Sequence, residues 1–302
     1  MDASFAIWIM QAFTGLSNFS VLLLMALGLA IIFGQMNVIN MAHGEFLTIG
    51  AYTTYVLSHV GERVGPWLLR WYFLFAVVLA FVIAGLVGLV VEHVMIRRLY
   101  RRPLDTLLAT WGLSLIMQQA FRSTFGAREV TATLPDWLMG SLKPTPSIDI
   151  PINGLFVMGI TLVLTALVFV GLFRTRIGVD VRATMQNRAM AGAAGVNTPR
   201  VDRYTFAFGC GLAGIAGAAF TTIGSTGPTA GSSYIVDTFL VVVFGGAQSL
   251  LGTIGSAFVI AQTQATTEFF MTGSMAKVLT LSLVILILMA RPEGLFALKV
   301  RR

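Results

Sequence analysis

The fold is decided by a stretch in which polar residues interrupt two apolar runs, residues 27–52, LGLAIIFGQMNVINMAHGEFLTIGAY. An apolar run of about 20 residues is long enough to span a bilayer as a helix. Polar groups between two such runs cost several kcal/mol each in hydrocarbon unless they line water, meet one another or cap a helix end. The stretch therefore predicts two membrane helices joined by a polar break.

The composition of the whole chain supports a membrane protein. Of its 302 residues, 56% are hydrophobic and only 11% are charged, and the mean hydropathy is +0.84. That charge is too small to cover the surface of a soluble domain of this length, whereas lipid tolerates an apolar exterior. The net charge of +7 is explained by basic residues in the cytoplasmic loops of a membrane protein. No nucleic-acid partner is therefore predicted.

Apolar runs of spanning length recur along the chain. They cover residues 16–34, 44–60, 67–91, 104–122, 152–173, 204–226, 236–267 and 274–290. The run 236–267 is too long for one span and contains Gly245-Gly246-Ala247-Gln248-Ser249, which predicts a second break. We therefore expect one all-α integral membrane domain, residues 1–302, with eight or nine transmembrane segments and broken helices.

Loop charge orients these segments. Arginine-rich segments 92–103 and 174–203 and the basic tail are expected on the cytoplasmic side by the positive-inside rule. Segment 123–151 is long, rich in proline and slightly acidic, so it is predicted to be an extracytoplasmic loop. With these assignments, successive segments cross the membrane in opposite directions without contradiction, and the N-terminus lies outside. This pattern indicates a multi-pass protein of the cytoplasmic (inner) membrane.

The first break offers candidates for a translocation path: Asn37, Asn40, His43 and Glu45. Asn40 or His43 could cap the second helix, with Glu45 in its first turn. A buried network that only satisfies the broken helix is an equal alternative, and a proton relay between His43 and Glu45 is a third. The two side chains are two residues apart and do not share a helix face.

Two further segments carry polar or small residues at informative spacing. Thr110, Ser114 and Gln118 recur every four residues and form one stripe on a helix, facing either a path or a neighbouring helix. The run 239–261 resembles 27–52 in its interrupted pattern, either by chance or as one of the internal repeats that mark transport sites in membrane carriers. The second interpretation adds Gln248 and Ser249 as candidates. The Gly- and Ala-rich run 204–220 predicts close helix packing.

The loop 174–203 has helical composition over 181–194, and Gly195 fits a helix stop. The loop is expected to lie on the membrane surface or to dock into a partner. The sequence contains no G-K-[ST] phosphate loop and no other catalytic motif, so no enzyme and no cofactor are predicted. Its three histidines lack the spacing of a helical metal pair, so no metal site is predicted.

The chain resembles permeases of the branched-chain amino-acid type of ABC transporter over nearly its whole length. The resemblance rests on GLAIIFGQMNVINMAHGEFLTIGAYTTY (28–55), the loop and helix over 182–218, FLVVVFGGAQSLLGTIGSA (239–257) and RPEGLF (291–296). PLDTLLATWGLSLIMQQAFRSTFGA (103–127), PDWLMGSL (135–142) and YIVDTFLVVVFGG (234–246) are most similar to urea-importer permeases.

This resemblance implies an importer subunit whose energy comes from other chains. A second homologous permease, two cytoplasmic ATPases and an extracytoplasmic binding protein would complete it within membrane lipid. The small neutral substrate would be urea, with branched-chain amino acids or short amides as alternatives. A self-sufficient secondary transporter or channel is the alternative class. The implied ATPase-coupling residues are Arg182, Arg188, Ala189, Met190 and Gly195, and Arg188 stands where related permeases often have Glu.

Overall fold

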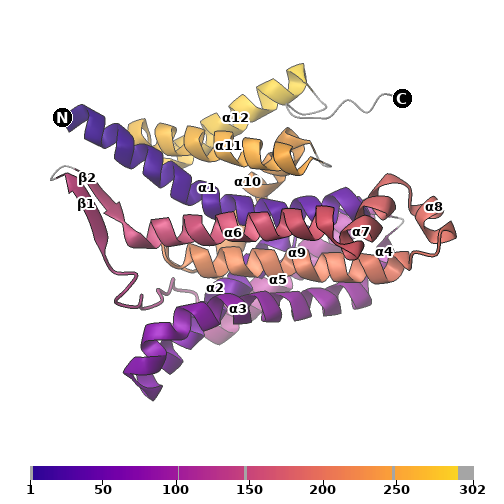
Figure 1. The fold of residues 1–302 in the computed structure, drawn as a ribbon, viewed down its shortest axis with the longest axis horizontal. Coiled ribbons are helices and arrows are strands. Elements are labelled where there is room, and N and C mark those ends of the chain that lie inside the picture. Colours follow the sequence, from indigo (N-terminus) through magenta and orange to yellow (C-terminus); the bar gives the residue numbers. More distant parts are fainter. Residues whose placement is uncertain (1–2, 101, 146–147, 247–248, 292–302) are drawn as a thin grey trace.

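A computed structural model describes residues 3–100, 102–145, 148–246 and 249–291, and it is dominated by helices (Figure 1). The long helices are α1 (Ala3–Met36), α2 (His43–Val64), α3 (Pro66–Val91), α5 (Pro103–Phe125), α6 (Ile152–Arg174), α9 (Thr198–Phe220), α10 (Ala230–Gly245), α11 (Leu250–Phe270) and α12 (Gly273–Ala290). Shorter elements are the π-helix η1 (Glu92–Ile96), α4 (Arg97–Leu99), α7 (Arg176–Gln186), α8 (Arg188–Ala193), β1 (Ser141–Thr145) and β2 (Ile148–Pro151).

Both predicted breaks are present. Helix α1 ends at Met36 and is followed by Asn37 with a positive φ of 51°, a conformation that the short polar side chain of Asn tolerates. Helix α10 ends at Gly245, and Gly246 has a φ of 87°, which glycine adopts readily. The predicted ends were wrong by six residues or more at three helices: α1 extends back to Ala3, α9 spans 198–220 instead of 204–226, and α10 begins at Ala230 instead of 236.

The all-α prediction needs one correction, in segment 123–151. Strands β1 and β2 form an antiparallel pair with Leu142 opposite Ile150, next to the N-terminal end of α1 (Figure 1). Trp137, just before the strands, packs edge-on against Phe156 of α6. Pro144 and Pro151 of the predicted loop are accommodated in these strands because a two-stranded ribbon leaves outward-facing backbone groups unpaired.

Helix α9 forms the centre of the bundle and packs against α1, α2 and α3. A side chain at Gly209, Gly214 or Gly217 would collide with Gly28, Ala80 or Leu47 on those three helices. The small residues of 204–220 therefore serve close helix packing, as predicted.

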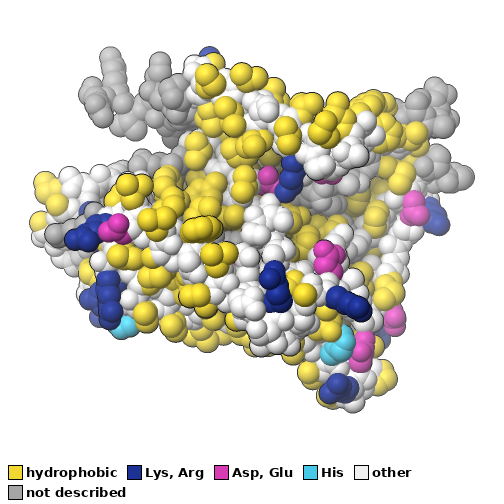
Figure 2. All heavy atoms as spheres, turned by 180° about the vertical axis from the view of Figure 1, so that it is seen from behind, with side chains coloured by type: hydrophobic (Ala, Val, Ile, Leu, Met, Phe, Trp, Pro, Cys, Tyr) yellow, Lys and Arg dark blue, Asp and Glu magenta, His cyan; other side chains and the backbone are white. Residues whose placement is uncertain are grey.

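The outer surface is apolar. Helices α3, α5, α6 and α12 expose large hydrophobic side chains, and Figure 2 shows such side chains over much of one face of the molecule. Within the described residues, four helices are long and apolar enough to cross a membrane: Ala6–Met36, Pro66–Leu99, Ile152–Arg174 and Gly273–Ala290. The count of eight or nine segments stays a prediction.

Candidate functional site

The first break folds back into the bundle. The chain is irregular from Asn37 to Asn40, and α2 begins at His43. The Nε2 atom of His43 lies 3.2 Å from the carbonyl oxygen of Met25. Met25 lies about three turns, or ~16 Å, before the end of α1. Helix α2 therefore starts deep inside the bundle and not at the end of α1.

The start of α2 is capped differently from the prediction. The N-cap residue is Ala42, without a side-chain cap, and the Oδ1 atom of Asn40 accepts the Ala42 N–H at 3.1 Å. Asn40 therefore acts two residues ahead of the N-cap, while Glu45 lies in the first turn as expected. There the positive end of the helix dipole favours a carboxylate.

The polar stripe of α5 faces the start of α2. A neighbouring helix was one of the two alternatives that the four-residue spacing predicted. Ser114 Oγ and Gln118 Nε2 each donate to Glu45 Oε1 at 2.8 Å. The N–H of Met41 donates to Thr110 Oγ1 at 3.1 Å. We call these five residues and Asn40 the central polar cluster. Within the described part of the chain, Glu45 Oε2 and Asn40 Nδ2 are buried without a hydrogen-bond partner.

The other candidates of the first break lie apart from this cluster. His43 is fully buried against α1, while Glu45 contacts α5. No hydrogen bond joins the two side chains, so the arrangement does not favour a proton relay between them. Asn37 is exposed at the end of α1, outside the central polar cluster.

The second break is built differently. Ser249 Oγ accepts the Gly252 N–H at 3.0 Å and thereby caps α11, so this candidate has a structural role. Gln248 lies outside the described residues. The two interrupted stretches nevertheless meet, because α1 packs against α11 and α2 against α10. At the latter contact Thr48 Oγ1 accepts the Gly231 N–H at 3.0 Å.

The loop 174–203 contains two helices instead of the single one expected over 181–194. Asn187 has an extended backbone and separates α7 from α8, and its side chain caps α8 by accepting the Met190 N–H at 3.0 Å. Gly195 ends α8 with a φ of 94°, and the Val196 N–H donates to the Ala191 carbonyl at 3.0 Å. This is the glycine stop that the sequence predicted.

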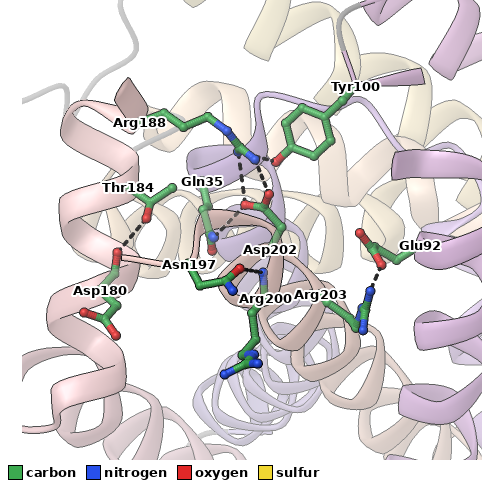
Figure 3. A network of polar contacts seen from close by, with 10 residues as sticks. All are labelled: Gln35, Glu92, Tyr100, Asp180, Thr184, Arg188, Asn197, Arg200, Asp202 and Arg203. Carbon is green, nitrogen blue, oxygen red and sulfur yellow. Dashed lines mark hydrogen bonds and ion pairs between the residues drawn. The ribbon is translucent and has the colours of Figure 1, made fainter. Parts of the chain in front are cut away.

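Arg188 points inward from α8 (Figure 3). Its guanidinium is paired with the carboxylate of Asp202 in α9, and Nη1 donates to the Tyr100 hydroxyl at 3.0 Å. Burial opposes the charge of Arg188, but the hydrogen bond to Asp202 and the neighbouring Tyr100 raise the pKa of Arg188 above its ordinary value. Asp202 Oδ1 also accepts from Gln35 Nε2 at 3.1 Å.

The remaining coupling candidates face outward or toward α6. Ala189 and Met190 are exposed, Met190 by 68%, at the end of the bundle opposite the β-hairpin (Figure 1). The guanidinium of Arg182 lies 5.0 Å from the centre of the Phe173 ring. Helix α8 therefore presents a small surface that a partner can reach.

Sequence reasoning missed an ion pair between α10 and α12. Lys277 Nζ lies 3.1 Å from Asp237 Oδ2, and it also donates to the Ser233 carbonyl at 3.0 Å. A charged residue in an apolar run was a signal that could have revealed this pair. The partners of Asp202 carried no comparable signal, because 167 positions separate it from Gln35.

No cluster of three metal-ligating side chains occurs in the described ranges. An apolar exterior and polar groups at a helix start inside the bundle are typical of membrane transport proteins.

The comparisons with known proteins identify the family. Residues 11–288 match the family described as "Branched-chain amino acid transport system / permease component", and the chain belongs to it. It is therefore a permease subunit and not an enzyme, and it is a multi-pass protein of the cytoplasmic membrane.

Similar curated proteins extend over the same length. The "High-affinity branched-chain amino acid transport system permease protein LivH" of Escherichia coli K12 is 28% identical, over 98% of this chain and 97% of its own. The protein BraD of Pseudomonas aeruginosa, with the same description, is 24% identical, over 95% of each chain. No solved structure matches this chain.

Proposed function

We propose that this chain is the membrane-spanning permease subunit of a binding-protein-dependent ABC importer for a small solute without net charge. The observation that carries the proposal is the central polar cluster, which places Glu45, Ser114 and Gln118 at the internal start of α2. In membrane carriers, helices interrupted within the membrane are typical of solute sites.

The proposed assembly contains the partners that such importers require. A second homologous permease would complete the path, two cytoplasmic ATPases would dock at the exposed residues of α8, and an extracytoplasmic binding protein would deliver the solute. Of the helices in the described part, we propose nine as membrane segments: α1, α2, α3, α5, α6, α9, α10, α11 and α12. With this alternation, α7 and α8 would lie in the cytoplasm.

The chemistry of the cluster fits a solute that both donates and accepts hydrogen bonds. Glu45 Oε2 offers an acceptor and Asn40 Nδ2 offers a donor, and both are buried without a partner among the described residues. Buried polar atoms left unpaired are costly. A passing solute or water would satisfy both of these atoms.

Branched-chain amino acids are the first substrate candidate, because the curated relatives are named for their transport. Urea or a short amide is the second candidate. Two observations favour this second candidate. Residues 103–127 resemble urea-importer permeases. In the described ranges, the side chains that form the hydrogen bonds of the cluster are amides, hydroxyls and one carboxylate, with no Lys or Arg. An amide needs no counter-ion, whereas the carboxylate of an amino acid is best held by a cation or a helix N-terminus.

The proposal is tested by uptake into proteoliposomes that contain the chain with its partner subunits. Uptake of labelled leucine or urea should require ATP hydrolysis and the binding protein, and competition between the two solutes assigns the substrate. Ser114→Ala should lower uptake several-fold, whereas Ser123→Ala, on the exposed side of α5, should not. Uptake by this chain alone, driven by an ion gradient, would reject the importer.

A further inference from the structure

A single buried carboxylate joins the cytoplasmic loop to the membrane helices. The side chain of Asp202 is only 2% exposed. It binds the guanidinium of Arg188 through both oxygens and accepts from Gln35 Nε2 at 3.1 Å (Figure 3). Asp202 thus holds a residue of α8 and a residue of α1 at the same point.

Both of these contacts lie directly beside functional elements. Gln35 is in the last turn of α1, two residues before Asn37 begins the first break. Tyr100, which Arg188 contacts through its hydroxyl at 3.0 Å and its ring at 4.5 Å, lies between α4 and α5. Helix α5 carries Ser114 and Gln118 of the central polar cluster. The Arg188–Asp202 pair therefore contacts one residue just before α5 and one residue just before the first break.

The neighbouring residue ties α9 to a third element. Arg203 Nε lies 3.5 Å from Glu92 Oε2 in the π-helix η1, and the side chain of Glu92 is buried. π-helical turns are frequent at functional sites. Since Gly209, Gly214 and Gly217 hold α9 closely against three helices, Asp202 at the start of α9 is the anchor at which Arg188 and Gln35 meet.

We propose that Arg188 and Asp202 form a positioning pair that transmits movement of α8 to the first break and to α5. This inference rests on the proposed function, in which an ATPase docks at α8. Arg188 itself is directed away from the docking surface, which Ala189 and Met190 provide. A displacement of α8 cannot leave the carboxylate of Asp202 unpaired, because a buried charge without a partner is strongly unfavourable. Because Tyr100 shares the guanidinium of Arg188 and Gln35 shares the carboxylate of Asp202, a shift of Arg188 changes both of these hydrogen bonds.

The test compares solute transported per ATP hydrolysed in proteoliposomes with the complete importer. Arg188→Gln should lower the amount of solute transported per ATP hydrolysed at least tenfold, and Arg188→Lys should restore part of the loss. Arg200→Gln is the matched control, because Arg200 is exposed on the same loop. Equal loss of hydrolysis and uptake in Arg188→Gln would overturn the proposal.

A second measurement needs no ATPase and is informative even if Arg188→Gln fails to assemble. Asn37 is exposed at the end of α1, so the thiol of Asn37→Cys can be labelled in the purified chain, where Cys210 is buried. Adding Arg188→Gln should change the labelling rate several-fold, and adding Arg200→Gln should not. An unchanged rate would refute the link between α8 and the break. Uptake independent of ATP in the unmodified complex would instead refute the proposed function.

Discussion

Replacement of Gly50 by alanine tests the close packing of α2 on α9. A Cβ atom at Gly50 would lie 1.9 Å from the carbonyl oxygen and 2.6 Å from the carbonyl carbon of Gly214. Ordinary contacts begin near 3.4 Å, so the helices must separate by about 1.5 Å at this point. The obstacle is backbone, which cannot rotate away as a side chain can.

The expected cost follows from overpacking, which destabilises by ~1–3 kcal/mol. Separation also loosens the adjacent contact of Gly217 with Leu47, so we expect a decrease of about 3 kcal/mol in the free energy of unfolding. Gly112→Ala is the matched control, since nothing lies within 4 Å of a Cβ there. It should be neutral or stabilising by up to ~1 kcal/mol, because alanine favours helix more than glycine does.

The assay is denaturant unfolding of the purified variants in detergent, followed by tryptophan fluorescence. If Gly50→Ala and Gly112→Ala unfold within about 0.5 kcal/mol of each other, the range typical of harmless surface substitutions, the tight approach of α2 and α9 is not a real constraint.

Three further substitutions probe other features. Gly195→Ala should destabilise the end of α8 by ~1 kcal/mol, because a φ of 94° is unfavourable for a residue with a Cβ. Hydrogen exchange of the α8 amides should accelerate. Unchanged exchange would show that Gly195 is not needed to end the helix. Lys277→Met should cost about 1 kcal/mol, because the Lys277 side chain is 41% exposed and solvent screens the pair, and the addition of Asp237→Leu should recover most of this loss. Equal stability of the single and double variants in thermal unfolding would argue against the ion pair. Ser256→Ala removes the 2.6 Å hydrogen bond to the Val241 carbonyl and should lower stability by ~1 kcal/mol; no change in the same assay would show that the bond contributes nothing.

Local pattern predicted the helices well, because spanning length and the polarity of a break are properties of contiguous sequence. The four-residue spacing of Thr110, Ser114 and Gln118 indicated a shared face, and that face does contact the start of α2. The sequence also indicated that Gly195 ends a helix.

Contacts between distant segments were beyond such reasoning. Nothing near Asp202 indicates that its partners are Arg188 and Gln35, since that pairing depends on how α1, α8 and α9 pack. The strand pair after Trp137 was missed because its prolines indicate irregular structure in a short segment. The break at Asn187 was missed because composition does not reveal that a polar side chain caps the following helix.

The backbone contacts of α9 determine where conformational change can be absorbed. At Gly209, Gly214 and Gly217 the surrounding helices leave no room for even one added methyl group. Neither sliding nor rotation of α9 past its neighbours is therefore available without opening voids. We therefore expect rearrangements of the bundle to leave the contacts of α9 intact and to change backbone torsions at residues 37–40, the irregular segment between α1 and α2.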